Sequence, residues 1–159
     1  MQYRIEQLNE KKLIGNKMTM SFASNTTADL WKSFMPRRKE IAHGIGHELY
    51  SVQLYPELFF ENVDPHATFE KWAAMEVSDG SVIPPDMEMM TLLSGLYAVF
   101  SYKGPAGSPL PFQYIFQTWL PASGYALDMR PHFEVLGEKY KHNDPDSEEE
   151  IWIPIRMKD

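Results

Sequence analysis

The segments LWKSFMP (Leu30–Pro36) and IFQTWLP (Ile115–Pro121) decide how this chain is organised, because they match position by position in polarity. In each segment apolar side chains recur at the spacing of a helix face, and each segment ends at a proline, which stops a helix. Two matching helices in one chain indicate an internal repeat. We therefore predict two similar halves, about residues 1–80 and about residues 86–159, joined through a stretch rich in glycine and proline.

Segments typical of β-strands surround each predicted helix. They are Tyr3–Phe22, Leu49–Tyr55 and Phe69–Val77 in the first half, and Met90–Tyr102, Tyr125–Leu136 (interrupted near Pro131) and Ile151–Met157 in the second. Each half then has the order β-α-β-β. The sequence predicts an α+β fold built from tandem βαββ repeats.

Composition excludes several classes of function. The net charge of −7 repels phosphate backbones, so we expect no direct nucleic-acid binding. Cysteine is absent, which excludes disulfides, thiolate catalysis and cysteine-based metal sites. The chain has no apolar run of about 18 residues and starts MQYRIEQLNEKK, so we expect no membrane span, no secretory signal and a cytoplasmic bacterial protein.

Metal and cofactor sites are not expected either. His43 and His47 are four residues apart, but the glycines around them argue against the helix that would bring them together. The acidic run Asp144–Glu150 lacks the central glycine of a calcium loop, and we expect it to be a solvated loop. We predict neither a bound metal nor a cofactor.

Alternation along the strands sorts candidate residues onto two faces. The three isoleucines of Ile151–Ile155 share one face and are predicted to pack against the helices, while Glu150 and Trp152 point the other way. If the last two strands are antiparallel neighbours, Glu134 can share a surface with Trp152. A carboxylate among aromatic rings suits a lipophilic cation, because the rings supply cation–π attraction and the carboxylate the counter-charge.

The residues alone leave a simpler interpretation open for each of these side chains. A single strand carboxylate such as Glu134 is more often a solvated surface group. Trp72, Trp119 and Trp152 are more often core residues than parts of a pocket. The patterning therefore identifies candidates, and it does not assign a site.

Longer stretches of the chain resemble a known family. The chain contains, in order, KKLIG, LWKSFMPRRKEI, GLYAVFSYKG, WLPASGY, RPHFEVLGEKY and EEEIWIPI. Together these resemble the gyrase-inhibitor-like (GyrI-like) small-molecule-binding family, which includes effector-binding domains of AraC-type and multidrug-sensing bacterial regulators. The resemblance covers essentially the whole chain, which we therefore treat as a single domain, 1–159.

The resemblance implies two βαββ units related by a pseudo-twofold axis, with antiparallel sheets forming a concave ligand cleft and the helices packed behind. Family members hold an acidic residue in that cleft for cationic aromatic compounds. Glu134 matches that residue, and Glu150 with Trp152 matches an acidic-x-aromatic pattern of the last strand. The remaining ligand-binding candidates are Tyr50, Trp72, Trp31 and Leu110.

The function expected from the resemblance is binding or sensing of an amphipathic, cationic aromatic compound by a module without its own DNA-binding domain. A protein partner, DNA gyrase or a transcription regulator, is part of this expectation. One alternative is a hydrolase that opens strained cyclopropane-type rings, in which Glu134 would activate water and Trp72 or Trp152 would stack the substrate. Another is a gyrase-interacting protein whose acidic run Asp144–Glu150 mimics the charge of DNA.

Overall fold

The structure is a computed structural model that describes residues 1–142 and 144–159. Its strands are β1 (Gln2–Leu8), β2 (Lys11–Ser21), β3 (Leu49–Leu54), β4 (Thr68–Val77), β5 (Glu88–Leu92), β6 (Gly95–Lys103), β7 (Tyr125–Leu127), β8 (His132–Leu136) and β9 (Glu148–Met157). Its helical segments are α1 (Thr27–Phe34), the 3-10 helix η1 (Met35–Glu40), α2 (Leu110–Tyr114), the π-helical turn η2 (Ile115–Trp119) and α3 (Leu120–Ala122). Among the described residues, no helix is long and apolar enough to cross a membrane.

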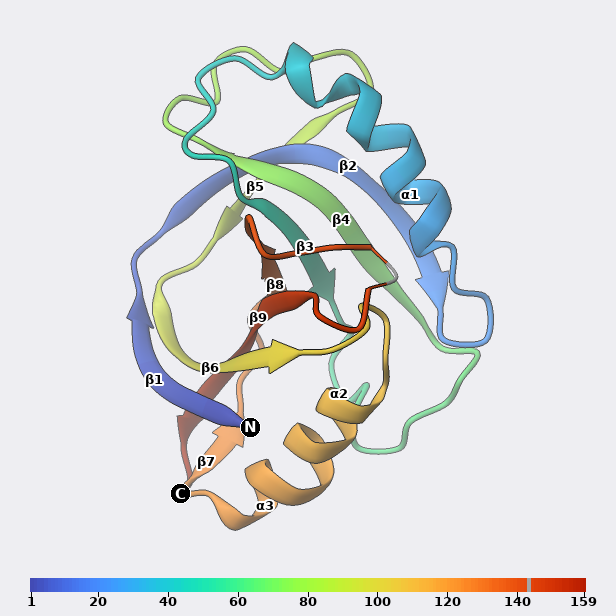
Figure 1. The fold of residues 1–159 in the computed structure, drawn as a ribbon. Helices are drawn as coiled ribbons and strands as arrows, with labels where there is room; N and C mark the ends of the chain where they lie inside the picture. The colour runs from blue at the N-terminus through green and yellow to red at the C-terminus, as the bar shows by residue number, and fades with distance from the viewer. Residues whose placement is uncertain (143) are drawn as a thin grey trace.

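Strand order confirms the tandem βαββ fold. The antiparallel sheet runs β1-β6-β9-β8-β3-β4-β2-β5, with β7 paired to β9. This order is symmetric about the β8–β3 pair when β2-α1-β3-β4 is matched with β6-α2-β8-β9, as a pseudo-twofold axis requires. Figure 1 shows the sheet curled round on itself with the helical segments outside it.

Two predicted strands are each divided into two strands in the structure. In each case, one of the two resulting strands pairs with a strand of the other half. The segment Tyr3–Phe22 separates into β1 and β2, and Met90–Tyr102 lies within the region of β5 and β6. β1 pairs with β6 of the second half, whereas β5 pairs with β2 of the first half. Each half therefore completes the sheet of the other.

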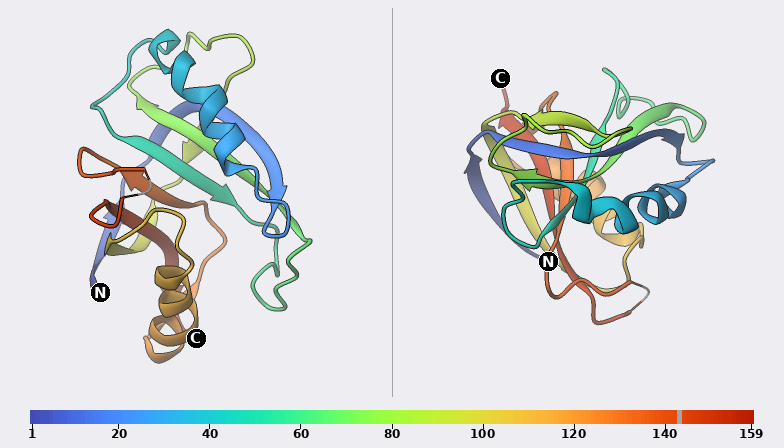
Figure 2. Two further views of the ribbon diagram at one scale, coloured as in Figure 1. Left: turned by 45° about the vertical axis from the view of Figure 1, so that its right-hand side comes forward. Right: turned by 90° about the horizontal axis from the view of Figure 1, so that it is seen from above.

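The curled sheet has an inner and an outer face, each with its own core. The inner face encloses one apolar cluster. On the outer face, α1 packs over β2 and β4, and the α2–η2 segment packs over β6 and β9. The isoleucines of Ile151–Ile155 were predicted to pack against both helices, and they pack against one of them, through Ile115 and Trp119. In the left view of Figure 2, α1 and α2 lie at opposite ends of this face, with β3 and β8 between them.

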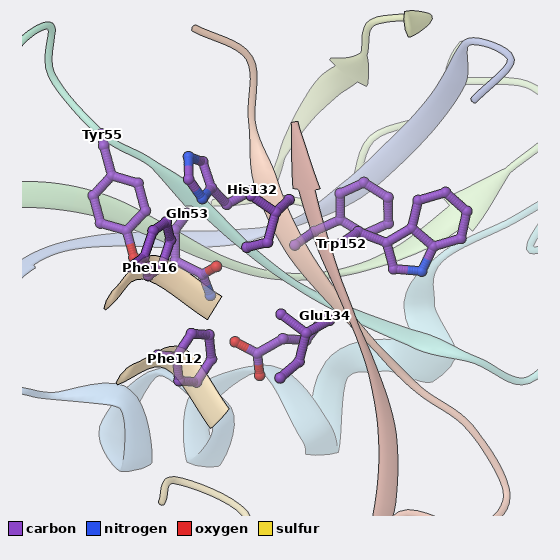
Figure 3. Close-up of a pocket in the computed structure, with 10 residues that line it drawn as sticks. Gln53, Tyr55, Phe112, Phe116, His132, Glu134 and Trp152 are labelled. Atoms are coloured by element: carbon purple, nitrogen blue, oxygen red, sulfur yellow. The ribbon is translucent and has the colours of Figure 1, made fainter. Parts of the chain in front are cut away.

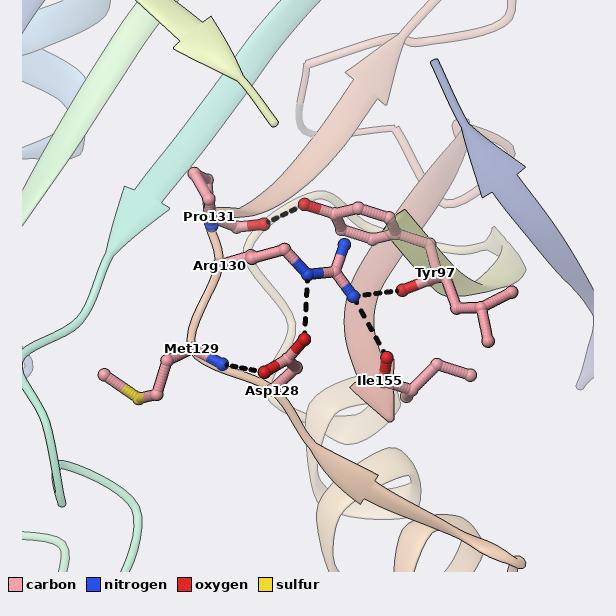
Figure 4. A network of polar contacts seen from close by, with 7 residues as sticks. Tyr97, Asp128, Met129, Arg130, Pro131 and Ile155 are labelled. Atoms are coloured by element: carbon pink, nitrogen blue, oxygen red, sulfur yellow. Dashed lines mark hydrogen bonds and ion pairs between the residues drawn. The ribbon is translucent and has the colours of Figure 1, made fainter. Parts of the chain in front are cut away.

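Arg130 fixes the interruption between β7 and β8 (Figure 4). Its Nε donates to Asp128 Oδ2 at 2.9 Å, and its Nη2 donates to the carbonyl oxygens of Leu96 at 2.6 Å and Ile155 at 3.0 Å. The guanidinium also lies 4.7 Å from the ring centroid of Tyr97. These contacts join the β7–β8 connection to β6 and β9, and so hold in place the strand that carries the candidate site.

Candidate functional site

A small pocket lies on the outer face, where β3, β8 and β9 pass between the two helical segments (Figure 3). It is lined by Gln53, Tyr55, Phe112, Phe116, His132, Phe133, Glu134, Ile151, Trp152 and Ile153. Its free volume is about 10 Å³, room for about one water molecule. Side chains of the protein itself therefore fill most of the space between the sheet and its covering residues.

Strand pairing brings Glu134 to this pocket. Glu134 lies opposite Ser51 on β3 and opposite Ile151 on β9, and residues directly opposite one another share a face. Its carboxyl group points toward Phe112 of α2 in Figure 3. Phe112 and Phe116 both reach the pocket because side chains four residues apart lie on the same side of a helix. The result is a carboxyl group beneath aromatic rings.

A second carboxyl group, that of Glu149, accompanies Glu134. Glu149 has the same strand parity as Ile151, and its carboxyl group hydrogen-bonds to that of Glu134. Burial raises the pKa of Glu134. Burial, followed by the neighbouring Glu134 carboxylate, raises the pKa of Glu149 to about 8. Two carboxyl groups in hydrogen-bond contact repel one another strongly when both are ionised, so the pair holds at least one proton near neutral pH.

Lys71 of β4 supplies a positive charge that acts on this pair. It opposes the upward pKa shifts of both Glu134 and Glu149. Its Nζ donates to Thr27 Oγ1 at 3.1 Å, which ties it to the first turn of α1. Lys71 thus acts as an internal counter-ion for the carboxyl pair.

His132 contributes an uncharged aromatic wall. It is only 5% exposed, and burial lowers its pKa to about 3, so the ring is neutral at neutral pH. Ring centroids of Tyr55, Phe60 and Phe116 lie 4.9, 5.5 and 6.2 Å from it. The stacked Phe60 and Phe116 rings, 4.9 Å apart, belong to the same aromatic group.

Comparison with known proteins assigns the chain to a family. The model of the GyrI-like small molecule binding domain matches residues 1–156. The chain belongs to this family. The Transcriptional regulator BrlR of Pseudomonas aeruginosa is 28% identical over 158 residues, which are 98% of this chain. The chain spans only 56% of that regulator's length.

Solved structures share the fold of this GyrI-like domain. SAV2435 bound to tetraphenylphosphonium has a TM-score of 0.71 at 17% identity, over 98% of this chain and 94% of that one. The EcmrR C-terminal domain has a TM-score of 0.66 at 18% identity, over 99% and 98% of the two chains. The predicted membership is confirmed, and the domain is a small-molecule-binding domain.

One expectation about the GyrI-like site is wrong. Glu134 and Trp152 do not share a surface, because Trp152 lies opposite Phe133, whereas Glu134 lies opposite Ile151. The Phe133 and Trp152 rings stack at 5.1 Å on the inner face. Both residues border the pocket, but in Figure 3 the Trp152 indole points away from the Glu134 carboxyl group.

The other inner-face candidates have partners within the domain. Tyr50 and Trp72 are buried in the inner core. Glu150 accepts from Arg4 Nη2 at 2.9 Å and from Trp152 Nε1 at 3.2 Å, and the Arg4 guanidinium lies 5.9 Å from the Trp152 ring centroid. The chain's own arginine therefore supplies the cation beside the acidic-x-aromatic pattern.

The two helix candidates lie away from the pocket lining. Trp31 packs against Phe34 of α1, with ring centroids 5.8 Å apart, and Leu110 is 68% exposed at the start of α2. Which residues a ligand contacts remains a prediction for all of the candidates.

Glu149 was missed because we expected Asp144–Glu150 to be a solvated loop. In the structure β9 begins at Glu148, so Glu149 is a strand residue on the isoleucine face. Extending the alternation of Ile151–Ile155 back by two residues would have found it. Among the described residues, no group of three or more His, Asp or Glu side chains is placed to hold a metal ion.

Proposed function

We propose that this domain binds amphipathic, cationic aromatic small molecules in the outer-face pocket between α1 and α2, with Glu134 as the counter-charge. The observation that carries the proposal is the position of the Glu134 carboxyl group beneath Phe112 and Phe116. A dehydrated carboxylate is costly without a cation, and an aromatic cation would offset that cost. Each ring over the cation would add about 0.5–2 kcal/mol of cation–π attraction.

Charge gives such a pocket its selectivity. A neutral aromatic compound gains the ring contacts but leaves the carboxyl group without a new partner. A cation of the same shape gains both. The fold shared with SAV2435, whose structure holds tetraphenylphosphonium, supports a lipophilic cation as the ligand class.

The aromatic cover must move before such a ligand enters. The free volume of about 10 Å³ is far below the roughly 300 Å³ or more of typical ligand pockets. The cover on one side is the short α2–η2–α3 segment, in which prolines and a π-helical turn interrupt regular helical hydrogen bonding. We infer that ligand entry displaces Phe112 and Phe116 with this segment.

We propose that the domain recognises the compound and does not itself contact DNA, because its net charge is −7. A transcription regulator or DNA gyrase is the protein partner through which binding would act. The similarity to BrlR supports the regulator, since that protein is a transcriptional regulator of which this chain spans 56%.

The test is a dye-displacement screen with matched pairs of compounds that share an aromatic skeleton and differ only in charge. We expect the cationic member of each pair to displace the dye at lower concentration. Equal potency across the pairs would remove the electrostatic part of the proposal. Recovery of the compounds after incubation separates binding from catalysis, because a hydrolase would consume a strained-ring substrate and a binding module would return it unchanged.

A further inference from the structure

Three charged groups meet beneath the aromatic cover. Glu134 and Glu149 hydrogen-bond to one another, and Lys71 acts on both. All three side chains are partly buried. Lys71 is also held by Thr27 at 3.1 Å, so its ammonium group is fixed beside the pair. The cluster reaches the pocket through Glu134, which lines it.

Among the residues that the structure describes, Lys71 is the one other charged group that shifts the pKa of Glu134 or Glu149. β3 contributes the neutral Ser51 and Gln53, β6 pairs Tyr102 with Glu149, and α2 contributes Phe112. The titratable neighbours other than Lys71 among the described residues include His132 on β8, Tyr55 after β3 and Tyr140 before β9. At neutral pH the His132 ring and these phenols are uncharged.

We propose that the pocket takes up one monovalent organic cation in exchange for the proton shared by Glu134 and Glu149, while Lys71 stays in place. This inference rests on the proposed function, and it adds the charge of the ligand and the regulation of its binding by pH.

The exchange follows from charge balance. With one shared proton, the two carboxyl groups and Lys71 sum to zero charge. A bound monocation would leave the cluster with one uncompensated positive charge in partly dehydrated surroundings, which is costly. Release of the shared proton restores zero charge. A dication would leave an excess charge even after that release, so the cluster selects for a single positive charge.

The direction of the pH dependence follows from the same exchange. Because the pKa of Glu149 is raised to about 8, the proton must be displaced at any lower pH. Linkage then predicts that affinity rises about tenfold per pH unit up to about pH 8 and levels off above it. Fixed-charge cations show this behaviour without any titration of their own.

The experiment is calorimetric titration of the whole chain with tetraphenylphosphonium, which cannot titrate, between about pH 6 and about pH 8.5. Titrations near pH 7 in phosphate and in Tris, whose ionisation enthalpies differ, count the protons released. We expect about one proton per bound cation and an affinity gain of about 50-fold from pH 6 to pH 8. The neutral triphenylphosphine oxide should bind with no proton release and no pH dependence.

Variants separate the roles of the three groups. Glu149→Gln removes the carboxyl group that shares the proton with Glu134, so the affinity for tetraphenylphosphonium should depend less on pH than it does in the unmodified chain. Lys71→Met leaves one negative charge on the protonated pair, so binding at about pH 6 should tighten at least about tenfold, with less proton release. Glu88→Gln, at an exposed carboxyl group on edge strand β5, is the charge-matched control and should match the unmodified chain.

The outcomes of these titrations separate the proton exchange from the proposed function. Binding of tetraphenylphosphonium with no proton release and a flat pH profile overturns the exchange and leaves the proposed function intact. An absence of binding across the whole pH range overturns both. The proton count on the unmodified chain needs no variant, so the inference stays testable if Lys71→Met fails to fold.

Discussion

Glu134 and Trp152 lie on adjacent strands but project from opposite faces of the sheet, because Glu134 is opposite Ile151 and Trp152 is opposite Phe133. The acidic side chain therefore joins the pocket under α2. The indole joins the inner core, where Glu150 already pairs with Arg4. On the outer face, a carboxyl pair lies beside a pocket with an aromatic cover, so this face is where we place ligand binding.

Phe112 should contribute directly to ligand affinity. Phe112→Ala removes a ring that lies over the Glu134 carboxyl group, and we expect the dissociation constant for tetraphenylphosphonium to rise about tenfold, which corresponds to about 1.4 kcal/mol. Tyr114→Ala, on the same helix but 36% exposed and away from the pocket lining, is the control. Equal losses from both variants would mean that the helix as a whole is affected and that the ring has no specific role.

Stability should decrease as pH rises from about 6.5 to about 8. The folded chain raises the pKa of Glu149 from 4.5 to about 8, so in this window it binds more protons than the unfolded chain and loses that advantage as pH rises. The raised pKa of Glu134 acts in the same direction. Because both groups are partly exposed, we expect a slope below about 1 kcal/mol per pH unit in the free energy of unfolding.

Urea unfolding at several pH values checks this, with Glu149→Gln as the comparison. The variant should flatten the slope in that window. Below about pH 6.5 the pKa of His132, lowered from 6.5 to about 3, adds a slope of the opposite sign, because the unfolded chain then binds the extra proton. A slope unchanged in Glu149→Gln would show that the carboxyl pair is not its source.

Arg130 should stabilise the fold through the hydrogen bonds that its side chain donates. Arg130→Met removes the guanidinium that donates to Asp128 Oδ2 and to the carbonyl oxygens of Leu96 and Ile155, and we expect the free energy of unfolding to fall by about 1.5–3 kcal/mol. Arg156→Met removes an exposed arginine whose ion-pair distance to Asp159 is 4.0 Å. That control should change stability by less than about 0.5 kcal/mol.

Gly15 should tolerate no side chain, because β2 passes β4 too closely there. A Cβ at Gly15 would overlap the carbonyl oxygen of Ala73 and would lie 2.6 Å from the Cα of Ala74. Gly15→Ala should therefore destabilise the fold by about 1–3 kcal/mol in thermal or urea unfolding. Gly124→Ala, where nothing lies within 4 Å of the added carbon, serves as the matched substitution. Similar stability of the two variants would contradict this account.

The repeat and its elements could be predicted from the sequence because they depend on local patterns. The helix stripe that includes Ile115 and Trp119 and the isoleucine alternation of Ile151–Ile155 each fix a buried face, and both are confirmed. The edge exchange of β1 and β5 could not be predicted in this way. It depends on which distant strand each segment pairs with, and no short pattern encodes that choice.

The candidate site could be predicted only in part, because local patterns identify its residues but not the pairing of its strands. Glu134 follows from the family motif, and its aromatic neighbour Phe116 lies in the predicted helix segment Ile115–Pro121. Whether Glu134 and Trp152 share a face depends on the register between β8 and β9, which alternation within either strand leaves undetermined. Lys71 is brought toward the carboxyl pair by the pairing of β4 with β3, so its role depends on tertiary structure.

The most direct test of the central claim is a comparison of tetraphenylphosphonium affinity between the unmodified chain and Glu134→Gln, measured near pH 8 with triphenylphosphine oxide in parallel. We predict that the variant binds the cation at least about tenfold more weakly and binds the neutral compound unchanged, since only the cation uses the carboxylate. An intact, folded Glu134→Gln that binds the cation as tightly as the unmodified chain would contradict the account.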